Sequence, residues 1–229
     1  MKTDAIWEER DPETGDTVIY TEPRPTPDGV GLIASDCVHN LRSALDQLVY
    51  SLSWTHTAGP MRHTTVTGSE FPIYGPRAPY PTEIAKRIGW VHPDAQAVIK
   101  RLQPHHRGNA YASDELWILD QLWNIDKHRR LPFMAAAVNI STTLGGGPGR
   151  VEMHKLAISG GGPIRRKTEL MRWDYVGPNH TMDMKRSFRR EITLGEGTPA
   201  PGEALVPLLA RLADYVEDDV LRQLTPFLG

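Results

Sequence analysis

Three features are scarce in this sequence: cysteine, long apolar runs and an excess of charge. The one cysteine, Cys37, excludes a disulfide framework and a cysteine-rich metal site, and its apolar neighbours suit a small buried side chain. No apolar run approaches membrane-spanning length, and residues 1–16 lack the apolar core of a signal peptide. We therefore expect a cytoplasmic protein without a membrane partner. The formal net charge of −2 argues against a surface that binds polyanions over its whole extent.

Charge is nevertheless uneven along the chain. Residues 150–190 hold ten Lys and Arg against four Asp and Glu. This imbalance is typical of a local basic surface or, more simply, of solvated strands with Arg and Lys on their outer face.

A more local absence is the most informative feature. Between Gly29 and His56 there is no Lys and no Glu, although an apolar stripe of period 3.6 predicts a helix over about 30–54. A solvated helix face normally uses long, helix-favouring charges. The face opposite the stripe instead carries short or planar polar groups, which indicates that it meets another polar surface inside the protein. These residues are Asp36, His39, Asn40, Arg42, Ser43, Asp46, Gln47 and Tyr50.

The remaining pattern predicts an α+β protein. Helical periodicity recurs over about 82–88, 93–103, 113–130 and 203–224. Extended segments are predicted at about 17–20, 133–140, 150–158, 168–175 and 182–194. We expect a helical bundle of about four main helices, with an antiparallel β meander between the third and the last of them. A chain of 229 residues suits a single domain at 1–229, with a helical core at about 29–130 and 203–228 and the meander at about 131–195.

A second polar cluster ends the helix predicted at 113–130. Asp126 falls near the middle of that helix's apolar side, where a carboxylate is costly unless it is paired or hydrogen-bonded. If Asp126 or His128 faces the first helix, the two clusters form one site. The predicted site then contains Asp36, His39, Arg42, Asp46, Asn124, Asp126 and His128.

These residue types suit acid/base chemistry on a phosphate-containing substrate. The catalytic candidates are His39 or His128 as acid or base, with Asp46 and Asp126 as carboxylate partners, and Arg42 as an anion clamp. A structural polar network between two helices would use the same residues. Two His and several Asp could also bind Zn, Mn or Fe, but no HExxH or comparably spaced ligand motif supports a metal site. The sequence identifies no cofactor.

Two motifs carry a resemblance to known families. The chain contains HNLRSALD at His39–Asp46 and N-x-D-K-H-R at Asn124–Arg129, the second after an LQP segment at Leu102–Pro104. With these motifs, residues 29–133 resemble a widespread family of uncharacterised bacterial proteins, a resemblance that implies no established activity. The chain also weakly resembles HEPN-type helical ribonucleases, whose motif is an Arg followed after four to six residues by a His. Here Gln47 follows Asp46, so His39 or His128 would have to replace the motif's imidazole.

Two functions are consistent with these patterns. The first is an enzyme that acts on a phosphate-containing substrate such as RNA through the inter-helix pocket. The second is a non-catalytic protein that binds a small ligand or another protein, with the polar cluster as a structural network.

Overall fold

The computed structural model describes residues 6–22, 26–27, 29–57, 70–79, 81–129, 131–144, 156–158, 164, 166–173 and 184–229. The chain divides into two compact units. The strand unit comprises Met1–Asp28, Phe133–Glu196 and Gly202–Leu205. The helical unit comprises Gly29–Pro132, Gly197–Pro201 and Val206–Gly229. That the chain forms a single domain stays a prediction.

The strand unit contains two antiparallel sheets. One has the order β1-β2-β5-β4, and the other pairs β3 with β6. Their bounds are β1 Ile6–Arg10, β2 Thr17–Thr21, β3 Phe133–Leu144, β4 Leu156–Ile158, β5 Thr168–Trp173 and β6 Met184–Leu194. The α+β class is therefore confirmed. The strands do not form a meander confined between the third and the last main helix, because β1 and β2 near the N-terminus extend the sheet of β5.

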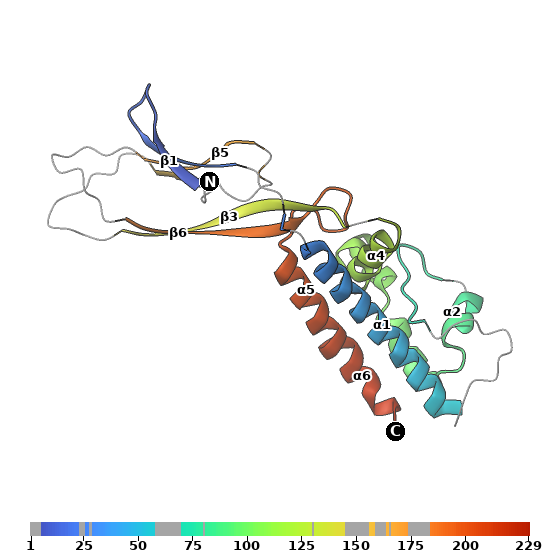
Figure 1. Cartoon of the computed structure of the whole chain (residues 1–229). Coiled ribbons are helices and arrows are strands. Elements are labelled where there is room, and N and C mark those ends of the chain that lie inside the picture. Colours follow the sequence, from blue (N-terminus) through green and yellow to red (C-terminus); the bar gives the residue numbers. More distant parts are fainter. Residues whose placement is uncertain are drawn as a thin grey trace. The chain divides into compact units, whose positions relative to one another are not determined.

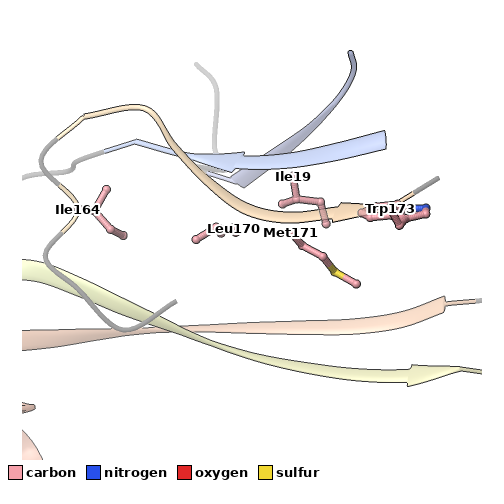
Figure 2. Packing of buried hydrophobic residues seen from close by; sticks show 5 residues of the cluster. All are labelled: Ile19, Ile164, Leu170, Met171 and Trp173. Atoms are coloured by element: carbon pink, nitrogen blue, oxygen red, sulfur yellow. The ribbon is translucent and has the colours of Figure 1, made fainter. Parts of the chain in front are cut away.

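The core of the four-stranded sheet is small and apolar. It consists of Ile19, Ile164, Leu170, Met171 and Trp173, with Ile6 packed against it (Figure 2). On the same sheet Arg172 donates to Asp11, Asp16 and Glu169, which raises the pKa of the guanidinium mainly through its hydrogen bonds to Glu169. This cation of the basic stretch is thus neutralised within the sheet. The segments predicted at 150–155, 174–175 and 182–183 lie outside the described residues.

The helical unit is built around one long helix. Its elements are α1 Val30–Thr57, α2 Pro81–Ile88, α3 Pro93–Arg101, η1 Pro104–Ser113, α4 Glu115–His128, α5 Leu205–Asp214, η2 Tyr215–Leu221, α6 Arg222–Leu224 and η3 Thr225–Phe227. The apolar stripe of α1, including Val38, Leu45 and Leu52, is buried as its spacing predicts. α1 packs against α4, and the C-terminal helix runs alongside α1 (Figure 1). Among the described residues, no helix has the length and apolar character to cross a bilayer.

The C-terminal helix contains a wider turn that the periodicity did not predict. η2 is a π-helix, in which the backbone N–H of Arg222 donates to the carbonyl of Glu217. The buried residues Leu212, Val216, Val220 and Leu224 repeat every fourth position. In an α-helix each such step overshoots a full turn by about 40°, so the stripe would leave the core. The wider turn offsets this drift and keeps the stripe buried.

Candidate functional site

A buried arginine, Arg42, forms an ion pair with the half-buried Asp46 on α1. Arg42 is 3% exposed, and its Nη1 donates to Asp46 Oδ1 at 2.5 Å, one helical turn away. Both side chains also bind the backbone of Phe71: Arg42 Nη2 donates to the carbonyl at 2.8 Å, and Asp46 Oδ1 accepts from the N–H at 2.8 Å. The polar surface that this part of α1 meets is therefore the backbone of the irregular segment 70–79.

Arg42 also connects α1 with α4. Its guanidinium carbon lies 5.0 Å from the ring centroid of Trp123, and Lys127 Nζ lies 3.0 Å from the same centroid. Two cations therefore contact one indole ring. The Nε atom of Arg42 is buried and has no hydrogen-bond partner among the described residues. Two of the five guanidinium N–H groups have protein acceptors, and at 3% exposure the guanidinium is almost closed to solvent.

Burial changes the acid strength of two carboxyl groups here. It raises the pKa of Asp46, and the charge of Arg42 partly offsets the rise. It also raises the pKa of Asp120 on α4, again with a smaller opposing effect from Arg42. Asn124 Nδ2 donates to Asp120 Oδ2 at 2.9 Å. The sequence prediction did not include Asp120. Its position one helical turn before Asn124 could have indicated that the two side chains are neighbours on α4.

Asp126 contacts α1, but its partner there is not one of the α1 residues of the predicted site. It is half-buried and accepts a hydrogen bond from Ser35 Oγ, which the prediction did not include. This contact joins α1 and α4 at a point two helical turns from Arg42 along α1. Asp126 is thus hydrogen-bonded by a neutral hydroxyl group.

The two predicted acid/base residues are on the surface. His39 and His128 are exposed, as are Asp36 and Asn40. His39 Nε2 lies 3.5 Å from Ser43 Oγ. Within the described part of the chain, no hydrogen bond or ion pair joins either imidazole to Arg42, Asp46 or Asp126. Their assignment as catalytic residues stays a prediction.

The positions of the Asp and His side chains also decide whether they could bind a metal ion together. In the described residues, no three His, Cys, Asp or Glu side chains form a group that could hold a metal ion. The Asp and His side chains of α1 and α4 instead belong to separate contacts.

A cavity of about 240 Å³ lies elsewhere in the helical unit, and we call it the α2–α3 cavity. Its apolar wall comes from α2, α3 and the segment 70–79. The wall residues are Pro72, Ala78, Pro79, Ile84, Ile88 and Ile99. Ile84 and Ile88 are four positions apart, so they share one face of α2. Tyr74, Lys100, Gln103, His105 and His106 complete the lining. The sequence prediction included none of these residues.

Gln103 holds two walls of this cavity together. Its Nε2 donates to the carbonyls of Pro72 and Ile99, both at 2.9 Å. Its Oε1 accepts from the backbone N–H of Tyr74 at 3.0 Å. The carbonyl of Tyr74 in turn accepts from the N–H of His105 at 3.1 Å. The irregular segment therefore has its backbone groups bound by α1 at Phe71 and by Gln103 and His105 further along.

Two lining residues carry shifted pKa values. Burial lowers the pKa of His105, and the neighbouring His106 adds to this effect, so the imidazole of His105 is neutral at pH 7. Burial raises the pKa of the Tyr74 hydroxyl, although the nearby Arg87 opposes the rise. Tyr74 Oη and His105 Nδ1 are buried without a hydrogen-bond partner of normal geometry in the described residues. Such groups are uncommon in folded proteins and are candidates for contact with a ligand or water.

No protein-family model, curated protein or solved structure matches this chain. The resemblance to the bacterial family with the HNLRSALD motif, and that to HEPN-type ribonucleases, therefore stay predictions from the motifs.

Proposed function

We propose that this protein binds a small ligand without transforming it, that the α2–α3 cavity is the binding site, and that the polar contacts between α1 and α4 are a structural network. The observation that carries the proposal is the cavity itself, which has a mainly apolar wall and a few polar groups. Concave, largely apolar sites with few polar groups are typical of small-molecule binding.

The contacts of Arg42 support the structural half of the proposal. An anion clamp needs a guanidinium that a ligand can reach, whereas Arg42 is 3% exposed and both of its Nη atoms are bound within the protein. An acid/base pair needs an imidazole within hydrogen-bond reach of its carboxylate. His39 and His128 are exposed and have no such carboxylate partner among the described ion pairs.

The size of the cavity limits the ligand. An apolar cavity of about 150 Å³ accommodates benzene, and pockets for drug-sized ligands begin at about 300 Å³. At about 240 Å³, the α2–α3 cavity suits a molecule with one ring or a branched aliphatic chain.

Benzene is therefore a suitable first probe. In a titration followed by NMR of ¹³C-labelled isoleucine methyl groups, we expect saturable shift changes at Ile84, Ile88 and Ile99, and none at Ile118. Ala78 is exposed and lines the cavity, so Ala78→Trp should block binding by filling the opening. Ala97 is exposed on α3 and does not line the cavity, so Ala97→Trp is the matched control. No saturable change at any of the three cavity isoleucines would exclude the proposed site.

A second candidate function is action on a phosphate-containing substrate such as RNA. The observation that favours it is the exposed cationic end of α4, where Lys127, His128 and Arg129 are all accessible. For this function we expect cleavage of members of a labelled RNA and nucleotide panel, with or without divalent metal, and loss of that cleavage in His128→Ala or His39→Ala. A panel left intact by the wild-type protein would contradict it.

A further inference from the structure

We infer that the ligand of the α2–α3 cavity is a small carboxylic acid with an aromatic or branched aliphatic body, and that its carboxylate binds at Lys100 Nζ. The inference rests on the proposed function, because it assigns a ligand class to the same cavity. Three features of the lining support it: a cation without a carboxylate partner among the described residues, a Tyr74 hydroxyl group without an acceptor there, and an apolar wall.

Among the described lining residues, Lys100 carries a permanent positive charge. None of these residues is an Asp or a Glu, and His105 is neutral at pH 7. Within the described residues, the partner of Lys100 Nζ is Gln96 Oε1 at 3.4 Å, a long contact with a neutral acceptor. No carboxylate pairs with this ammonium group among the described ion pairs. A ligand anion would therefore gain a charge-assisted hydrogen bond without displacing a protein carboxylate.

The other polar groups of the lining are bound mainly within the protein. Gln103 donates both amide hydrogens to backbone carbonyls, and its oxygen accepts from the N–H of Tyr74. His106 Nε2 lies 3.0 Å from the carbonyl of Lys100, a contact that also occupies that acceptor. The Tyr74 hydroxyl lacks an acceptor among the described residues, and a ligand oxygen would be the complementary group.

The apolar wall determines the body of the ligand. Ile84, Ile88 and Ile99 approach from two helices, and Pro72 and Pro79 come from the irregular segment. Burial of a hydrocarbon body against such a wall contributes about 25 cal/mol per Å² of apolar surface. The anionic end must stay near the opening, where Lys100 is exposed, because a carboxylate is costly to bury.

Three probes of nearly equal shape test the charge preference: phenylacetate, phenylacetamide and phenethylammonium. We expect phenylacetate to bind about fivefold or more tightly than the amide, the size of one exposed ion pair, and the ammonium to bind most weakly. Lys100→Gln should reduce the affinity for phenylacetate to that for the amide and leave the affinity for the amide unchanged. Lys100→Arg should restore the preference for the carboxylate. Lys86→Gln is the control, because Lys86 is exposed on α2 and does not line the cavity.

The outcomes separate the two proposals. If phenylacetamide and phenylacetate bind equally well at the cavity isoleucines, the cavity is a binding site and the inference about charge is wrong. An effect of Lys86→Gln as large as that of Lys100→Gln would attribute the preference to overall charge and overturn the assignment of Lys100. If none of the three probes nor benzene shifts the isoleucine signals, both proposals fail.

Discussion

Arg42→Ala is expected to lower the free energy of unfolding by about 3 kcal/mol, because two groups lose their hydrogen-bond donor and each such loss costs about 1–3 kcal/mol. The substitution leaves the half-buried carboxylate of Asp46 without its cation and the carbonyl of Phe71 without its donor. It also removes the guanidinium from the face of Trp123. Urea unfolding followed by circular dichroism at 222 nm measures the change, provided that the slope with urea concentration stays that of the wild type.

Asp126→Ala is the comparison variant for this experiment. Asp126 is half-buried and its partner is the Ser35 hydroxyl, so we expect a smaller loss of about 1–2 kcal/mol. The larger cost is expected for Arg42, because it is the more deeply buried of the two side chains. If Arg42→Ala is no more destabilising than Asp126→Ala, the Arg42 contacts are not the structural network of our proposal, and a role of Arg42 in substrate binding regains support.

Helix α1 shows both the strength and the limit of sequence reasoning. Its apolar stripe determines which residues are buried, because helical periodicity is a local property. The absence of Lys and Glu predicted that the opposite face meets a polar surface. Arg42 and Asp46 do so, but the other side chains of that face are largely exposed, among them Asp36, His39, Asn40, Gln47 and Tyr50. The partner of Arg42 and Asp46 is the backbone of Phe71, some 25 residues further along the chain. A backbone carbonyl or N–H has no signature in the side-chain pattern, so the sequence suggested α4 instead.

The candidate binding site was missed for a related reason. Residues 70–79 lack a secondary-structure period, so the sequence pattern identifies no helix or strand there. The cavity exists because Gln103 and His105 bind the backbone of Pro72 and Tyr74. Gln103 lies in the LQP segment, which the sequence marks only as part of a family resemblance, and nothing in that motif indicates which backbone groups its amide binds.

The strands show that the pairing of strands is harder to predict than their positions in the sequence. β2, β5 and β6 begin and end within a few residues of the predicted segments. β1 was missed because the N-terminal segment was interpreted as polar and acidic, and its pairing with β2 buries little of it. β2 and β5 are about 150 residues apart, and their registry includes a shift between Ile19 and Tyr20. Local alternation carries no information about such a distant partner.

Gln103→Leu is expected to lower the free energy of unfolding by about 3 kcal/mol and to abolish binding in the α2–α3 cavity. Leucine has a similar size, but it leaves the N–H of Tyr74 and the carbonyl of Pro72 without their hydrogen-bond partners. An unsatisfied buried backbone group costs about 1–3 kcal/mol. Urea unfolding measures the stability, and the methyl signals of Ile84 and Ile88 report whether the cavity wall keeps its packing.

Gln96→Leu, on the preceding helix α3, is the matched control. Gln96 Nε2 donates a single hydrogen bond, to the carbonyl of Val91 at 2.9 Å, and Gln96 does not line the cavity. We expect it to cost about 1 kcal/mol and to leave benzene binding intact. If Gln103→Leu binds benzene as the wild type does, Gln103 does not hold the cavity open. The two variants together test whether a single amide determines both the path of the irregular segment and the space in which the ligand binds.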